Sequence, residues 1–282
     1  MTRRVVVHVD DVGMCHGANR AFVELSASGF ATSGSVMVPC PWFAEAAECA
    51  ASDPALDLGV HLTLTAEKRH YKWGPVSGVR PGSGLTDANG HFWRDVAAVR
   101  ANCRADAAAA ELRTQIDIAI AAGIDVTHLD THMGVTNAPE LCDTYLDLAR
   151  ELDVPLLLTR DMAHNSTRAH LEGVDPARYD ATVTRARSLG FTVFDEMLET
   201  EWNPTARPID VYRELFSSIG DGLTFLALHP NAPGELHLIE PRSEHVRVGE
   251  YELFCDPAFA GWVDDLGIER VGMRELREEL RA

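Results

Sequence analysis

The sequence predicts a single α/β domain built as a (β/α)-barrel, similar to a TIM barrel, with seven or eight parallel strands. Short apolar runs alternate with longer helical stretches, which is typical of parallel α/β proteins. A chain of 282 residues can bury one large core, and no repeat or linker divides it, so residues 1–282 are predicted to form one domain. Strands are predicted at Val5–Val9, Ser33–Val38, Leu56–His61, Val126–Asp130, Val154–Leu158, Thr192–Phe194, Thr224–Leu228 and, more weakly, near Arg270–Met273.

Helical patterns lie between most of these runs. The clearest are Asn19–Ala27, Phe43–Ala51, Arg104–Ala122 and Pro139–Glu151. Two stretches lack any periodicity. Glu67–Trp93 is rich in glycine and is predicted to be a long βα insertion over the mouth of the barrel, and Asp161–Asp180 is predicted to be irregular.

The composition excludes several classes of partner. There are 43 acidic residues against 25 basic ones, which argues against binding to nucleic acid or to an anionic membrane surface. The three valines that follow Met1–Arg4 are too few for a signal peptide or a membrane span. We therefore expect a soluble cytoplasmic protein, and the sequence also allows a homodimer.

Two adjacent carboxylates, Asp10 and Asp11, end the first apolar run. Neighbouring residues of a regular strand point to opposite faces, so both can reach one pocket only where the strand ends and the chain turns at Gly13. One carboxylate can then bind a metal while the other stays free as a base. Taken alone, Asp-Asp-Val-Gly also fits an ordinary turn.

Histidines occupy the ends of other predicted strands. His61 ends one strand, and the segment Thr127–His132 ends another. The carboxyl ends of parallel barrel strands share one face, so these side chains are expected to meet the two aspartates there. A carboxylate with two imidazoles makes a three-ligand metal site with room for water. This coincidence at separate strand ends favours a metal site over isolated core histidines.

Residue alternation places His128, Asp130 and His132 on one face of their strand. Spacing alone does not decide whether His128 or His132 binds the metal. Asp130 either orients a metal-bound histidine or contacts the substrate. His8 lies inside the first strand and is predicted to pack in the core or to support the site.

His229 follows the apolar run Thr224–Leu228 and precedes Pro230, which ends that strand. On the shared barrel face it would serve as a general acid, and the alternative is a surface histidine in a loop. Trp73 and Phe92, in the predicted insertion, either stack on a sugar or close the loop's own small core.

Together these motifs resemble the YdjC-type carbohydrate deacetylases, the chitooligosaccharide deacetylase family. The resemblance is carried by an ordered series of motifs: Val9-Asp10-Asp11-Val12-Gly13, Gly17-Ala18-Asn19-Arg20-Ala21, Ala31–Val38, Asp57–Thr65, Leu85–Phe92, Glu111 with Gln115, Thr127–His132, Leu228-His229-Pro230, and Arg247 with Glu250. Such a series is more specific than any single motif.

The resemblance implies a barrel hydrolase in which Asp11, His61 and His132 bind the metal, Asp10 is the general base and His229 the general acid. Two motifs depart from the family pattern. Many members carry further histidines where Met133–Val135 follows here, and many have His-Pro-Gly where Asn231 follows His229-Pro230. These departures bear on the substrate preference.

The expected function is that of a metal-dependent N-deacetylase that binds a small carbohydrate and releases acetate and a free amino sugar. The expected cofactor is one divalent ion, zinc or magnesium first, with manganese and cobalt as alternatives. Two other functions remain open at this point. One is hydrolysis of a different amide or ester at the same site, and the other is sugar binding by a non-catalytic barrel.

Overall fold

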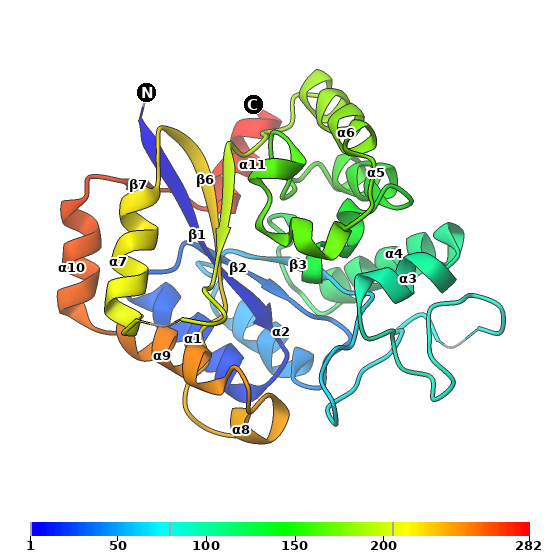
Figure 1. Cartoon of the computed structure of the whole chain (residues 1–282), viewed down its shortest axis with the longest axis horizontal. Coiled ribbons are helices and arrows are strands. Elements are labelled where there is room, and N and C mark those ends of the chain that lie inside the picture. Colours follow the sequence, from blue (N-terminus) through cyan, green and yellow to red (C-terminus); the bar gives the residue numbers. More distant parts are fainter. Residues whose placement is uncertain (1, 79, 205) are drawn as a thin grey trace.

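A computed structural model describes residues 2–78, 80–204 and 206–282. These residues form a curled parallel sheet with helices packed around it (Figure 1). The strand order is β4-β3-β2-β1-β6-β5, and β7 pairs with β1. The strands are β1 (Arg3–Val12), β2 (Ser33–Val36), β3 (Leu58–Leu62), β4 (Leu129–Thr131), β5 (Glu196–Glu199), β6 (Gly222–Leu228) and β7 (Glu269–Arg270).

Strand β1 is the centre of the sheet. Its residues Arg3 to Val9 pair with β6, its second half pairs with β2, and β7 pairs only with Arg4 and Val5. The valines of β1 are all buried, because a central parallel strand is covered on both faces. The parallel pairing brings the carboxyl ends of the strands to one edge, where the histidines and aspartates lie.

The structure does not confirm a complete barrel of seven or eight strands. The predicted strands Val154–Leu158 and Thr192–Phe194 contribute only isolated bridges, from Leu156 to Leu129 and from Phe194 to Thr159. Pro155 has no backbone N–H, which limits the ladder that the first of these segments can form. The short strand β5, with only two apolar residues, carries too weak a pattern to be predicted.

The helices surround the sheet, with α7, α9 and α10 on one side of the molecule and α3 to α6 on the other (Figure 1). The four clearest helical patterns correspond to α1, α2, α4 and α5. The helices are α1 (His16–Ala27), α2 (Phe43–Ser52), α3 (Val96–Asn102), α4 (Ala105–Ala121), α5 (Cys142–Leu152), α6 (Pro176–Ser188), α7 (Pro208–Ser218), α8 (Leu236–Ile239), α9 (Glu244–Phe254), α10 (Pro257–Asp265) and α11 (Met273–Arg281), with 3-10 helices η1 (His132–Asn137), η2 (Met162–His164) and η3 (Ser166–Leu171). In the part of the chain that the structure describes, no helix has the length and apolar character needed to cross a membrane.

The two stretches expected to be irregular differ from each other. Asp161–Asp180 is more ordered than predicted, because it contains η2, η3 and the first turn of α6. The insertion Glu67–Trp93 lacks helices over its described residues, and much of it lies near α3 and α4 (Figure 1). Glu111 of α4 anchors it by accepting hydrogen bonds from the backbone N–H groups of Val76 and Ser77, at 3.1 and 2.8 Å.

Two leucines that differ in burial should differ in their contribution to stability. Leu226 of β6 is 0% exposed, whereas Leu238 of α8 is 72% exposed. We expect Leu226→Ala to lower the free energy of unfolding by about 2–5 kcal/mol, because it leaves a cavity in a packed core. Leu238→Ala should change it by less than about 0.5 kcal/mol. Urea unfolding followed by circular dichroism measures both, and equal effects would contradict this placement of β6.

Candidate functional site

A bulge in β1 places Asp10 and Asp11 on the same side of the sheet. Val9 pairs with Gly34 and Val12 with Val36, so β1 has one residue more than β2 between these points. Asp11 absorbs the extra residue with a φ of 62°, in the left-handed region. The sequence placed this change of direction at Gly13, but it begins inside the strand.

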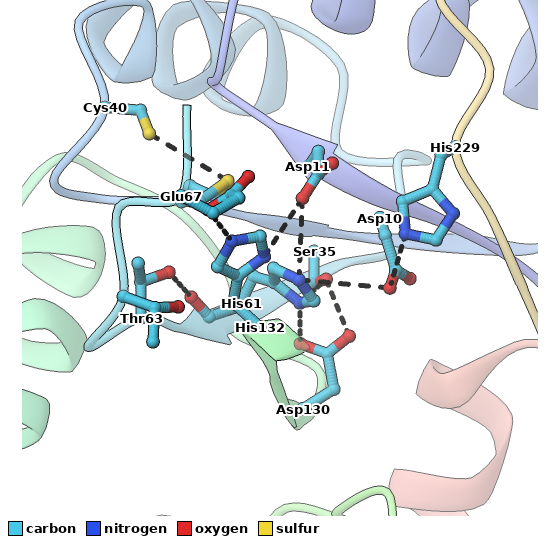
Figure 2. Close-up of polar contacts among 12 residues, drawn as sticks. Asp10, Asp11, Ser35, Cys40, His61, Thr63, Glu67, Asp130, His132 and His229 are labelled. Carbon is cyan, nitrogen blue, oxygen red and sulfur yellow. Dashed lines mark hydrogen bonds and ion pairs between the residues drawn. The ribbon is translucent and has the colours of Figure 1, made fainter. Parts of the chain in front are cut away.

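Asp11, His61 and His132 meet at the carboxyl edge of the sheet (Figure 2). They come from β1, β3 and the start of η1, and all three are buried. Oδ1 of Asp11 lies 3.3 Å from Nδ1 of His132 and 3.7 Å from Nε2 of His61. One donor atom from each residue lies within 4.8 Å of the other two, which is compact enough to surround one ion.

The surroundings of Asp11 fit a divalent cation. Its Oδ2 accepts a hydrogen bond from Arg247 at 2.7 Å, but its buried Oδ1 has no hydrogen-bond partner among the described residues. A buried carboxylate oxygen without a partner is costly, and a cation bound there would satisfy it. One carboxylate oxygen and two imidazole nitrogens form a donor set that suits Zn²⁺ and leaves a position open.

Carboxylates orient both imidazoles of this group. Nδ1 of His61 lies 2.9 Å from Oδ1 of Asp130, whose other oxygen accepts a hydrogen bond from Ser35 at 2.7 Å. Nε2 of His132 lies 3.0 Å from Oε2 of Glu67. Each histidine therefore uses one nitrogen for a carboxylate and turns the other toward Asp11, an arrangement common around protein-bound metals.

The electrostatics of this group follow from burial and pairing. Burial raises the pKa of Asp11, but the charge of Arg247 and the contact with His132 outweigh it and hold that pKa well below its usual range. Burial lowers the pKa of His132, but Glu67 and Asp11 outweigh it and raise the pKa to about 10. The site thus attracts positive charge, whether carried by an imidazolium or by a metal ion.

Asp10 and His229 face each other beside this group. Oδ2 of Asp10 lies 3.6 Å from Nε2 of His229, and its Oδ1 lies 2.7 Å from Nδ1 of His8. Nδ1 of His229 lies 2.8 Å from Oγ1 of Thr200, and this hydroxyl donates to Glu250 at 2.6 Å. Since the hydroxyl proton is directed to Glu250, Nδ1 of His229 carries hydrogen and its Nε2 is the acceptor that faces Asp10 (Figure 2).

The other predicted site residues lie away from the cavity. His128 is buried against His8 and Thr127, so the geometry groups His132, and not His128, with Asp11. Trp73 and Phe92 are buried in the main hydrophobic core, which also contains residues of the strands and helices, and not in a separate small core of the insertion. Neither ring lines the cavity, although Trp73 packs edge-on against His132 with 6.3 Å between ring centroids.

A cavity of about 380 Å³ opens above these groups, a size typical of small-molecule sites. Its wall includes an ion-pair cluster in which the buried Lys68 contacts Glu67 at 2.8 Å and Glu240 at 3.3 Å. Sequence reasoning missed several members of the wall, because no motif marks them. They are Glu67, Lys68, Glu199, Trp202, Glu240 and Arg242.

A family model described as "YdjC-like protein" matches residues 4–265, and so covers the strands that carry the site. The chain belongs to the YdjC-like family. Among its relatives, a carbohydrate deacetylase from Thermus thermophilus is 39% identical over 52% of this chain and 50% of its own length. A chitooligosaccharide deacetylase from Yersinia enterocolitica is 30% identical over 58% of this chain and 62% of its own length.

A third relative, a carbohydrate deacetylase from Thermoanaerobacter pseudethanolicus, is 28% identical over 61% of this chain and 66% of its own length. The chain therefore matches about half to two thirds of each of these relatives. Among solved structures, one described as a cellobiose-phosphate cleavage protein from Enterococcus faecalis superposes with a TM-score of 0.76, at 22% identity, over 98% of this chain and 99% of that one. This likeness supports the fold of the YdjC-like chain.

The geometry predicts which histidine governs metal binding. Removing a residue that only hydrogen-bonds to a metal ligand commonly weakens metal binding by about 10–100-fold. Since His132 is expected to bind the ion itself, we expect His132→Ala to bind Zn²⁺ more than about 10-fold more weakly. His170→Ala, at the rim of the same cavity, is the matched control and should bind normally. Isothermal titration of the metal-free proteins measures both affinities. Normal Zn²⁺ binding by His132→Ala would remove this residue from the ligand set.

Proposed function

We propose that this protein is a metal-dependent hydrolase that removes the acetyl group from an N-acetylated sugar or oligosaccharide and releases acetate and a free amino sugar. One observation carries the proposal: the group Asp11, His61 and His132 shares a cavity with the facing pair Asp10 and His229. Hydrolysis of an amide needs both parts, one to activate the carbonyl and one to move protons. The names of the relatives support a carbohydrate as the substrate.

Asp11, His61 and His132 would hold the divalent ion. Such an ion polarises a carbonyl and lowers the pKa of water toward neutrality. Arg247 holds the second oxygen of Asp11, so the carboxylate keeps one orientation. Asp130 and Glu67 fix the planes of the two imidazoles by their hydrogen bonds.

We assign to Asp10 the role of accepting the proton of the attacking water. Its Oδ1 is occupied by His8, whereas its Oδ2 faces the cavity near Nε2 of His61 and Nε2 of His229, at 3.9 and 3.6 Å. The free oxygen is therefore the one beside the reacting centre. This arrangement lets Asp10 act as a base without itself holding the ion.

His229 completes the proton transfer to the leaving amine. Burial lowers its pKa to about 4, although the charges of Asp10 and Asp11 partly oppose this, so the imidazole is neutral near pH 7. Its Nε2 can accept the proton that Asp10 takes from water and pass it to the amine nitrogen. The lowered pKa makes the protonated imidazole a strong acid at that moment. His229 thus acts after Asp10 rather than entering the reaction already charged.

The proposal is tested by incubating the zinc-loaded protein with N,N′-diacetylchitobiose and with simple acetate esters and acyl amides. We expect acetate and a free amine from the N-acetylated sugar, detected enzymatically and by mass spectrometry. Hydrolysis confined to the other amides or esters would replace the sugar substrate with another class. A protein that binds the sugar but releases no acetate would support a non-catalytic role.

We expect Asp10→Asn to keep its metal and lose most of its activity. Asparagine preserves the oxygen that accepts the hydrogen bond from His8 but cannot take up a proton. A general base typically contributes about 10²–10⁴-fold, so kcat should fall by that range. Elemental analysis and acetate release on the same sample test both parts. Unchanged turnover would exclude Asp10 as the base.

We expect His229→Ala to separate amide chemistry from ester chemistry. An amine needs a proton to leave, whereas an activated phenol does not. The variant should lose about 10²–10⁴-fold on an N-acetyl sugar and far less on p-nitrophenyl acetate. The ratio of the two rates, compared with that of the unaltered protein, is the measurement. Equal losses would indicate that His229 binds the acyl group instead.

A further inference from the structure

A continuous chain of hydrogen bonds crosses the core from Asp10 to Asp57. Oδ1 of Asp10 lies 2.7 Å from Nδ1 of His8, and Nε2 of His8 lies 2.9 Å from Nε2 of His128. Nδ1 of His128 lies 2.9 Å from Oγ1 of Thr127, which lies 2.5 Å from Oδ1 of Asp57. Asp10 is near the carboxyl end of β1, whereas Asp57 directly precedes β3. Because the strands are parallel, this series of hydrogen bonds connects opposite ends of the sheet.

The four links of this chain need more protons than its groups ordinarily carry. Each hydrogen bond requires one proton between its two heavy atoms. A neutral His8, a neutral His128 and the hydroxyl of Thr127 each bring one, and two ionised carboxylates bring none. Three protons would then serve four links, and two acceptor atoms would face each other across one of them.

Burial makes such an empty link expensive. His8, His128 and Thr127 are all 0% exposed, so water cannot fill a gap between two lone pairs. We infer that Asp57, Thr127, His128 and His8 form a buried relay that holds one additional proton, shared along its length, and thereby fixes the orientation of Asp10. The inference rests on the proposed function only in assigning Asp10 the role of base.

The additional proton can move along the relay without any side chain turning. A shift begins when Asp57 gives a proton to Oγ1 of Thr127, which passes its own proton to Nδ1 of His128. Nε2 of His128 then gives a proton to Nε2 of His8, and Nδ1 of His8 gives one to Asp10. Each group returns to its original proton count except the two carboxylates at the ends, so the charge moves while the atoms balance.

The surroundings favour the Asp57 end as the resting place. Burial raises the pKa of Asp57, although hydrogen bonds from the backbone N–H of Arg274 and from the hydroxyl of Thr127 stabilise its ionised form. When Asp57 holds the proton, the link to Thr127 reverses and the hydroxyl of Thr127 donates to Nδ1 of His128 instead. Burial and the neighbouring His8 lower the pKa of His128 to about 3, so His128 stays neutral. With the proton on Asp57, Nδ1 of His8 donates to Oδ1 of Asp10, whose Oδ2 faces the cavity beside His229.

Two glycines make room for this relay. A Cβ on Gly59 would lie 2.5 Å from Cε1 of His128, and one on Gly272 would lie 2.6 Å from Oδ2 of Asp57.

An alternative to the relay is a second metal ion between His8, His128 and Asp130, whose donor atoms also lie within 4.8 Å of one another. Two nitrogens bound to one tetrahedral zinc at about 2.0–2.1 Å would be roughly 3.3 Å apart. The 2.9 Å between the imidazoles fits a hydrogen bond better.

Neutron diffraction from perdeuterated crystals of the unaltered protein tests the proton count directly. We expect one deuteron in each of the four links between Asp10 and Asp57. A link without a deuteron would overturn the inference. Extra scattering from an ion between His8, His128 and Asp130 would overturn it too. This result does not depend on any activity.

Substitutions at Thr127 test the positioning role. Thr127→Val keeps the shape but removes the hydroxyl, so the relay loses its connection to Asp57. Nδ1 of the buried His128 is then left without a partner, and His128 and His8 are no longer held in the orientation that positions Asp10. We expect kcat for acetate release to fall about 10- to 100-fold, because small misplacements of a catalytic group are costly. KM and metal content should be unchanged, since Thr127 does not line the cavity. Thr127→Ser restores the hydroxyl and should recover most of kcat.

Comparing the two variants distinguishes a role of Thr127 in packing from a role of its hydroxyl in the relay. Equal losses in Thr127→Val and Thr127→Ser, or a rise in KM without a change in kcat, would show that Thr127 only supports packing. If the unaltered protein releases no acetate while all four links hold a deuteron, the proposed function fails and the relay stands. If acetate is released and a link is empty, the relay fails and the proposed function stands.

Discussion

Strand β1 carries one residue more than its neighbour β2 between Val9 and Val12, and the rest of the site depends on this bulge. A regular strand would send either Asp10 or Asp11 into the helices. With both on one side, the protein must accommodate two buried carboxylates only one residue apart. The positive φ of Asp11 adds a local conformational cost, which the surrounding contacts offset.

Each of the two carboxylates at the bulge has one oxygen in a hydrogen bond and one oxygen directed toward the cavity. Arg247 takes one oxygen of Asp11, and His8 takes one oxygen of Asp10. The remaining oxygens face the cavity, one toward His61 and His132 and one toward His229. Buried carboxylates left without partners would be protonated or would destabilise the fold. Stability and chemistry therefore use the same contacts, and a substitution of a supporting residue should affect both.

Much of the site was predictable because its residues end separate apolar runs. Parallel strands share one carboxyl edge, so Asp10, Asp11, His61, His132 and His229 could be expected to meet before any coordinates were known. The resemblance to YdjC-type deacetylases narrowed the ligand set further. Local periodicity and the positions of the strand ends were therefore sufficient to predict which side chains meet at the carboxyl edge of the sheet.

The remaining features depend on contacts between residues far apart in the chain. Arg247 lies 236 positions from Asp11, and neither residue's neighbours in sequence indicate that they pair. The bulge is a mismatch of register between two strands, and the incomplete closure of the sheet follows from Pro155 and from pairing that only tertiary structure reveals. Trp73 illustrates the same limit, since an aromatic ring in a polar loop suits either a sugar or a loop core.

The insertion that begins at Glu67 has two parts with different contacts. Its root belongs to the site, because Glu67 holds His132 and, through Lys68, is tied to Glu240. Its distal part is fastened to α4 by Glu111 and lies beside α3 and α4. Substitutions around Val76 and Ser77 should therefore leave the positions of Asp11, His61 and His132 unchanged, whereas substitutions at Trp73, which packs against His132, should not. Among its described residues, the insertion thus contributes to the cavity only through its first two, Glu67 and Lys68, and the segment around Val76 and Ser77 serves to cover α4.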